Sequence, residues 1–281
     1  MKGEFQGGDW AVLGCVLGIS LAVGIICAWI DRNKSTQEYM MGSKNTSPIP
    51  ISMSLAATFF SAITILGHPV EYYQYGTMYF YFLLTYTICS LISAHLFIPM
   101  YMDFGFTSTY EYMETRFHHS VRVMATLIYL INTIIYIGIA IYAPALALEA
   151  VTGLGKWASV WLTGSISIFY TSIGGLKAVV WTDSIQLVIM MSGFLGILIK
   201  GTVDHGTNTI FNTFRLGGRN VWDDFMIDPR YRHTFWSIVI GGICGVWGNT
   251  YCATQSMVQR MLACKNKSDM KYDSLTMTHL R

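Results

Sequence analysis

Small and hydroxyl side chains recur at helical spacing within an uncharged stretch that spans residues 50–76. No charged residue lies between Ile51 and Val70, and at about 1.5 Å per residue the stretch is long enough to cross a bilayer as a helix. Steps of three and four positions place on one helical face Ser54, Ala57, Thr58, Ser61 and Thr64. Because hydroxyl groups gain nothing from contact with lipid, this face points toward other helices or toward a water-filled cavity.

An acidic residue lies inside a second apolar stretch, residues 164–186. There Gly174 and Gly175 separate two apolar segments, and Asp183 follows near the start of the second segment. A carboxylate within a membrane is costly without a partner or an ion, so Asp183 is a candidate functional residue. The alternative is a structural carboxylate near a helix N-terminus, where the helix dipole contributes about 0.3–1 kcal/mol.

A third stretch, residues 247–260 with the sequence WGNTYCATQSMVQR, closes an apolar segment that glycines interrupt. It ends in two glutamines and an arginine. A transporter can unwind such a segment and offer backbone carbonyls and amides to a substrate. The stretch is therefore a candidate binding segment.

The composition is that of an integral membrane protein. Of the 281 residues, 53% are hydrophobic and 12% are charged, whereas soluble domains carry roughly 25% charged residues. The basic residues are scattered, with no run that could grip a phosphate backbone, so nucleic acid is not an expected partner. The six cysteines form no CxxC or CxxH pair, and the sequence shows no nucleophile–base pair and no HExxH motif. We therefore expect structural thiols and a protein that is not an enzyme.

Seven apolar segments predict an all-α membrane protein. Their limits are residues 10–30, 50–76, 77–101, 121–151, 157–173, 177–200 and 234–251. Lysine and arginine are more frequent in the loops on one side, and the positive-inside rule then places the N-terminus outside the cell. Seven segments with polar residues inside them fit a transporter, a channel or a receptor, and composition alone does not choose among these classes.

Several separated motifs make the chain resemble the sodium/solute symporter family. IGGLKAVVWTDSIQ at 173–186 is similar to the family's signature of a Gly-Gly turn followed by TDxxQ, and QSMVQR at 255–260 is similar to the motif that closes a later broken helix. Further matching runs are TSTYEY at 107–112, IYAPALAL at 141–148 and DPRYRHTFW at 228–236. The likeness runs from about residue 9 to residue 264 and favours the branch that carries monocarboxylates, multivitamins and iodide.

The resemblance implies a LeuT-like fold of two inverted five-helix repeats, which is incomplete in this chain. The implied divisions are 1–49 for a tail, an extra membrane helix and a cytoplasmic loop, 50–201 for the first repeat, 202–233 for an extracellular loop, 234–264 for the start of the second repeat, and 265–281 for an atypical polar tail. The resemblance also implies that the helix within 50–76 is broken, although this stretch has no glycine at mid-span.

Residue by residue, the resemblance implies a sodium site and a substrate site, with Na⁺ as the coupling ion, no other metal and no cofactor. The implied sodium-binding residues are Ala57 and Phe60, through their carbonyl oxygens, together with Ser61 and Asp183. The implied substrate-binding residues are Phe59, Thr64, Tyr136, Trp247 and Gln255. Each has a structural alternative, such as helix packing for the small residues and core packing for the aromatic ones. Thr254 and Met257 stand where relatives often carry Asn and Gln.

The resemblance implies sodium-coupled symport of a small organic anion, of monocarboxylate or vitamin type, across the plasma membrane by alternating access. The expected partners are Na⁺, the anion and the lipid bilayer, and no oligomeric state is implied. In this family a helix of the second repeat, which follows the region present here, completes the sodium site with hydroxyl groups. The alternative is a truncated, non-transporting form that associates with a full-length relative or competes against it.

Overall fold

The chain folds into a set of long and broken helices. The computed structural model describes residues 6–32, 35, 38–39, 42, 47–106, 108–228, 230–264 and 268, and for Trp247 it describes the backbone alone. Four helices in this part of the chain are long and apolar enough to cross a membrane. Two shorter helices, α3 (Pro48–Phe59) and α4 (Ala62–Tyr75), make a fifth candidate span that is bent by 59°.

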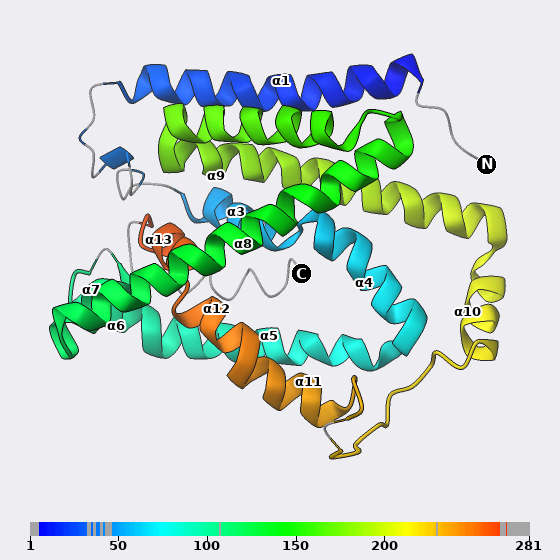
Figure 1. The fold of residues 1–281 in the computed structure, drawn as a ribbon. Helices are drawn as coiled ribbons and strands as arrows, with labels where there is room; N and C mark the ends of the chain where they lie inside the picture. Colours follow the sequence, from blue (N-terminus) through cyan, green and yellow to red (C-terminus); the bar gives the residue numbers. More distant parts are fainter. Residues whose placement is uncertain are drawn as a thin grey trace.

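The N-terminal helix packs along the longest helix of the chain. α1 (Gly7–Ile30) lies beside α9 (Lys156–His205), as Figure 1 shows. The amide nitrogen of Gln186 donates to the Ser20 hydroxyl across this contact, with the two atoms 3.2 Å apart. A polar pair thus holds two apolar helices in one register.

A turn at Gly175 divides α9 into the two spans that the sequence predicts at 157–173 and 177–200. Gly175 has φ 62° and ψ −162°, a conformation that residues with a side chain rarely adopt. Carbonyl groups freed near the turn bond to Tyr39, whose hydroxyl donates to the Ser172 carbonyl oxygen at 2.7 Å. The Tyr39 ring packs against the Gly175 backbone on the side where a Cβ atom would lie. The Gly-Gly junction between two spans is therefore confirmed.

The helix within 50–76 is broken at Phe60 and Ser61, between α3 and α4. Phe60 has φ −79° and ψ 57°, and Ser61 has φ −78° and ψ 167°. Both φ values are ordinary for residues with side chains, so the break needs no glycine. This explains why the local sequence does not mark the break.

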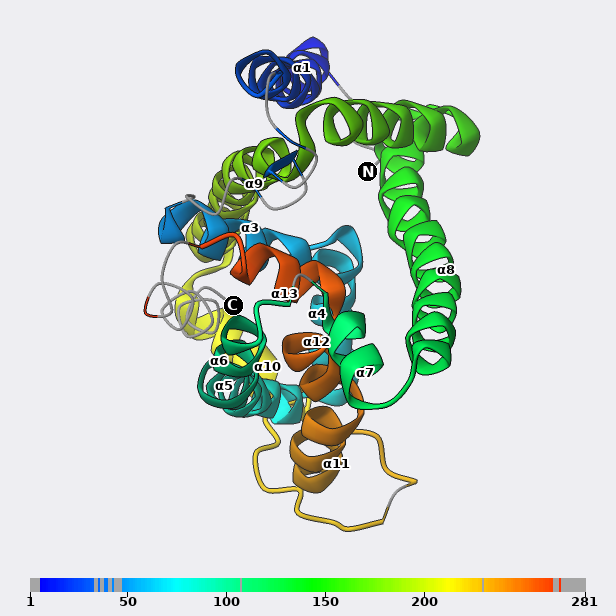
Figure 2. The same cartoon turned by 90° about the vertical axis from the view of Figure 1, so that its left-hand side faces the viewer.

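The next elements form a third membrane span and the long helix α8. The span comprises a 3₁₀ turn η2 (Thr77–Tyr81), α5 (Phe82–Ile92), a π-helical turn η3 (Ser93–Phe97) and α6 (Ile98–Asp103). The short helix α7 (Thr109–Arg116) leads into α8 (His119–Thr152). Figure 2 shows α8 running along one side of the molecule, facing the ends of α4, α12 and α13.

A second broken helix follows the loop after α9. The elements are α10 (Thr207–Leu216), α11 (Phe235–Gly241), a π-helical turn η4 (Gly242–Trp247), α12 (Gly248–Cys252) and α13 (Gln255–Met261). The loop before α11 is anchored to α4, because Glu71 lies 2.7 Å from the Arg232 guanidinium and 2.8 Å from His233 Nε2. The first broken helix, α3 and α4, thus contacts the loop that leads into the second broken helix.

We expect Gly175→Ala to destabilise the protein and Gly193→Ala to leave it as stable or more stable. A side chain at Gly175 is strained at positive φ and meets the Tyr39 ring at 2.7 Å, for a cost of about 1–3 kcal/mol. Gly193 is helical with open space around it, and alanine there gains helix propensity of about 1 kcal/mol. Thermal unfolding in detergent measures both, and equal melting temperatures for the two variants would contradict the prediction.

Candidate sodium and substrate site

The break between α3 and α4 leaves three backbone carbonyl oxygens without a hydrogen bond. The carbonyls of Ala57, Thr58 and Phe60 accept no hydrogen bond from any residue that the structure describes. α3 ends at Phe59, and the Phe60 amide bonds to the Ala56 carbonyl at 3.2 Å. A carbonyl without a donor is costly at membrane depth, and sodium-coupled transporters use unwound carbonyls to coordinate their ion.

Two hydroxyl groups lie at the same break. Ser61 caps the start of α4, where its Oγ accepts from the Thr64 amide at 3.4 Å and lies 3.2 Å from Thr64 Oγ1. Thr64 Oγ1 donates to the Phe59 carbonyl at 2.5 Å. Hard cations prefer oxygen ligands, and the carbonyls and hydroxyls together supply oxygens without a full negative charge. The break therefore has the donor chemistry that suits Na⁺.

At the second break, between α12 and α13, protein side chains satisfy two of the freed carbonyls. Ser93 Oγ donates to the Tyr251 carbonyl at 2.9 Å, and the Tyr101 hydroxyl donates to the Cys252 carbonyl at 3.1 Å. Both donors come from the third membrane span, which packs against this break. The carbonyls of Thr250 and Ala253 at this break accept no hydrogen bond from any described residue. Both breaks thus keep open carbonyls, three at the first and two at the second.

A cavity of about 1160 Å³ lies beside the first break. Its wall brings together five residues assigned to the site from the sequence: Phe59, Phe60, Ser61, Thr64 and Tyr136. Among the described residues that line it, Arg260 is the one Asp, Glu, Lys or Arg side chain. The remaining wall is mostly aromatic and hydroxyl-bearing, which fits a small polar ligand with apolar parts.

The other expected site residues lie elsewhere. Ala57 has one of the open carbonyls at the break and does not line the cavity. Gln255 lies at the start of α13, where its Oε1 accepts from the Thr109 amide at 3.2 Å and so ties α13 to α7. The Trp247 side chain is outside the described part of the structure. The cavity wall near these positions is formed instead by Asn249 and Thr254.

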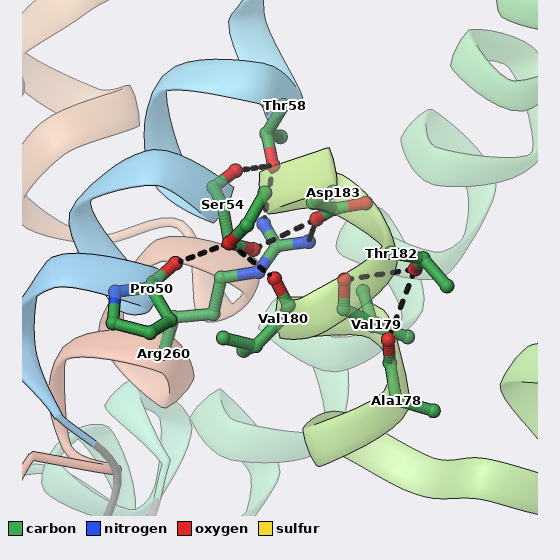
Figure 3. Close-up of polar contacts among 10 residues, drawn as sticks. Pro50, Ser54, Thr58, Ala178, Val179, Val180, Thr182, Asp183 and Arg260 are labelled. Carbon is green, nitrogen blue, oxygen red and sulfur yellow. Dashed lines mark hydrogen bonds and ion pairs between the residues drawn. The ribbon is translucent and has the colours of Figure 1, made fainter. Parts of the chain in front are cut away.

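Asp183 belongs to a buried ion pair that joins three elements (Figure 3). Its Oδ2 accepts from Ser54 Oγ of α3 at 2.7 Å and from Arg260 Nη2 of α13 at 3.1 Å. The other guanidinium arm of Arg260 donates to Thr58 Oγ1 at 2.6 Å. The two side chains are only 15% and 12% exposed. The costly carboxylate noted in the sequence thus has a partner, which balances its charge.

Two members of this cluster carry roles that sequence reasoning did not assign. Arg260 was noted only as the end of a motif, although a guanidinium beside an apolar stretch is itself a sign of a buried partner. Ser54 belongs to the polar face of residues 50–76, and its hydroxyl donates its hydrogen bond to Asp183. On that face, Ser54 and Thr58 thus bond to the ion pair, whereas Ser61 and Thr64 lie at the break.

We expect Asp183→Asn to be more destabilising than the double variant Asp183→Asn/Arg260→Gln. Removing one partner leaves a buried, uncompensated charge, which costs roughly 3–5 kcal/mol, whereas removing both charges avoids that penalty. Unfolding in detergent measures the difference. The matched control is Asp204→Asn, which breaks an exposed pair with Lys200 and should change stability by less than about 1 kcal/mol. A double variant as unstable as Asp183→Asn would refute this account.

Comparison with known proteins identifies the fold. The structure aligns with a Na⁺-coupled sialic acid symporter in its substrate-bound outward-open state, with a TM-score of 0.85 and 25% identity, over 99% of this chain and 57% of that chain. The fold is therefore LeuT-like, with inverted repeats, and the chain holds the first repeat and the start of the second.

Curated relatives match nearly the whole chain. It is 43% identical to sodium-coupled monocarboxylate transporter 2 of Danio rerio and 43% identical to sodium-coupled monocarboxylate transporter 1 of Homo sapiens, over 96% of this chain and 44% of each relative. It is 40% identical to the sodium/iodide cotransporter of Homo sapiens, over 95% of this chain and 42% of that protein. The chain thus spans less than half the length of these relatives. The model of the sodium:solute symporter family matches residues 39–280, and the chain belongs to that family.

Proposed function

We propose that this chain carries the sodium-binding and much of the substrate-binding part of a symporter for small organic anions of monocarboxylate or vitamin type. The observation that carries the proposal is the break at Phe60 and Ser61. It leaves three carbonyl oxygens that accept no hydrogen bond from the described residues, at the edge of a large cavity. The monocarboxylate transporters among the relatives support the substrate class.

In this proposal Na⁺ binds at the break, through the carbonyls of Ala57 and Phe60 and the hydroxyl of Ser61. Asp183 has a supporting role, because its Oδ2 is already shared between Ser54 and Arg260. A sodium ion on Asp183 would have to compete with that guanidinium. The ion pair instead holds α3 against α9 and α13, which positions the break.

The charge balance of the cavity favours binding of an anion together with Na⁺. The guanidinium of Arg260 is balanced by Asp183, so the described cavity wall has no unpaired permanent charge. An anion entering alone would bring a net negative charge into an apolar site, which is unfavourable. A sodium ion at the adjacent break cancels that charge, and each ligand then raises the affinity for the other.

The two broken helices supply the moving parts of alternating access. Na⁺ binds first and stabilises the outward-open state, because a ligand shifts a conformational equilibrium only through its different affinity for the two states. The substrate binds next to Phe59, Thr64 and Tyr136, and the cavity then opens to the other side. We place the protein in the plasma membrane with its N-terminus outside.

We expect sodium to stabilise the purified chain and to drive uptake of labelled lactate, nicotinate or biotin into cells that express it. Sodium at 100 times its dissociation constant should stabilise the folded state by about 2.7 kcal/mol. Uptake should vanish when choline replaces sodium. Sodium stabilisation without uptake would favour the non-transporting alternative. Co-expression with a full-length monocarboxylate transporter checks that alternative, because the chain should then change the uptake by the full-length protein.

A more specific test compares the apparent sodium affinity of two serine variants. Ser61→Ala removes an oxygen at the break and should weaken apparent sodium affinity by about tenfold, which corresponds to about 1.4 kcal/mol. The matched control is Ser192→Ala on α9, where the hydroxyl donates to the Ile189 carbonyl within its own helix. Unchanged sodium affinity in Ser61→Ala would remove this serine from the site.

The proposed orientation predicts glycosylation of α10. Ile210→Thr turns Asn208 into an N-x-Thr acceptor on an exposed helix of the loop after α9. Expressed in mammalian cells, this variant should gain a glycan that an amidase removes, seen as a shift on a gel. The native acceptor sequences at Asn33, Asn45 and Asn266 lie outside the described residues and should stay unmodified, because the proposed topology puts them on the cytoplasmic side. Glycans at the native acceptor sequences and none at Asn208 would show that the protein has the opposite topology.

A further inference from the structure

Polar residues on one face of α8 line the cavity opposite the broken helices. Tyr129, Asn132, Thr133 and Tyr136 all lie in the cavity wall, and their spacing of three and four residues places them on one face. Ile131 and Ile134, between them in sequence, are not in the cavity wall and are 60% and 69% exposed. α8 thus turns an apolar face outward and a hydrogen-bonding face toward the cavity.

The polar groups at the centre of this face have no partner in the described protein. The Asn132 carboxamide and the Thr133 hydroxyl make no hydrogen bond with any residue that the structure describes. Other threonines of α8 behave differently: Thr126 and Thr152 donate to carbonyls four residues earlier, at 2.8 and 2.6 Å. An asparagine inside a membrane helix is costly unless it meets a partner, and this one meets the cavity.

A second carboxamide reaches the same cavity from the second broken helix. Asn249 of α12 lines the wall, and its backbone carbonyl accepts from the Ala253 amide at 2.9 Å. Its side-chain amide has no hydrogen-bond partner within the described residues. Two uncharged carboxamides, each with two N–H donors, therefore face one cavity. The one guanidinium among its described lining residues, that of Arg260, is already paired.

We propose that Asn132 and Asn249 are specificity-determining residues that bind the carboxylate of the transported anion through their side-chain N–H groups. The inference rests on the proposed function and names the groups that recognise the anion at that site. Neutral donors suit a transported ligand, because a bidentate guanidinium would bind a carboxylate more tightly and hinder its release. Their directional N–H groups also favour a carboxylate, which has several defined lone pairs, over a spherical halide.

The test measures equilibrium binding of labelled nicotinate and lactate to the full 281-residue chain in lipid nanodiscs, in sodium chloride and in choline chloride. Asn132→Leu and Asn249→Leu should each weaken carboxylate binding in sodium by about tenfold or more. Asn132→Asp, nearly identical in shape, should weaken it further through charge repulsion. Asn132→Gln, which keeps the donors, should retain part of the affinity. The matched control Asn212→Leu lies on exposed α10 and should bind as the wild type does.

Sodium-induced thermal stabilisation, recorded for the same variants, separates this role from a structural one. It should stay unchanged in Asn132→Leu and Asn249→Leu if these amides act on the anion alone, whereas misfolding would reduce it together with anion binding. Wild-type carboxylate affinity in both leucine variants would overturn the inference and leave the proposed function standing. No carboxylate binding by the wild-type chain in sodium would overturn both.

Discussion

Inside a bilayer, a backbone carbonyl without a donor is costly, and this constraint acts at three helix breaks in the described part of the chain. At Gly175 the Tyr39 hydroxyl bonds to a freed carbonyl, and at the break before α13 Ser93 and Tyr101 do the same. At Phe60 and Ser61 the carbonyls of Ala57, Thr58 and Phe60 accept no hydrogen bond from any described residue. Side chains of the protein thus satisfy some of the freed carbonyls, and in the proposed function the open ones at Phe60 and Ser61 bind an ion.

The buried pair of Asp183 and Arg260 makes the open break possible. It joins α3, α9 and α13, which come from distant parts of the sequence. Its hydrogen bonds reach Ser54 and Thr58, and Thr58 lies two residues before Phe60. A strained or under-bonded segment persists only where its surroundings fix it. The ion pair also balances the charge of Arg260, the one Asp, Glu, Lys or Arg side chain in the described cavity wall.

Much of this arrangement could be predicted from the sequence. The helical spacing of polar residues and the energetic cost of a charged residue in an apolar stretch can both be judged from neighbouring residues alone. The polar face of residues 50–76 and the expense of a carboxylate at Asp183 are visible without a structure. The partner of Asp183 is not, since Arg260 lies 77 positions away and no spacing rule connects them. Nor is the break, because Phe60 adopts an ordinary φ. Gln255 was expected in the substrate site and instead bonds to Thr109, which only packing of α7 against α13 reveals.

The balanced guanidinium in the cavity wall has an electrical consequence. In the proposed transport cycle, the described cavity wall therefore adds no net charge, whether the site is empty or holds one sodium ion and one monovalent anion. Membrane voltage would then do no work on the described wall in either state. Each sodium ion beyond the first would add about 2.3 kcal/mol of driving energy per 100 mV. In this proposal the number of sodium ions thus decides whether voltage helps to concentrate the solute.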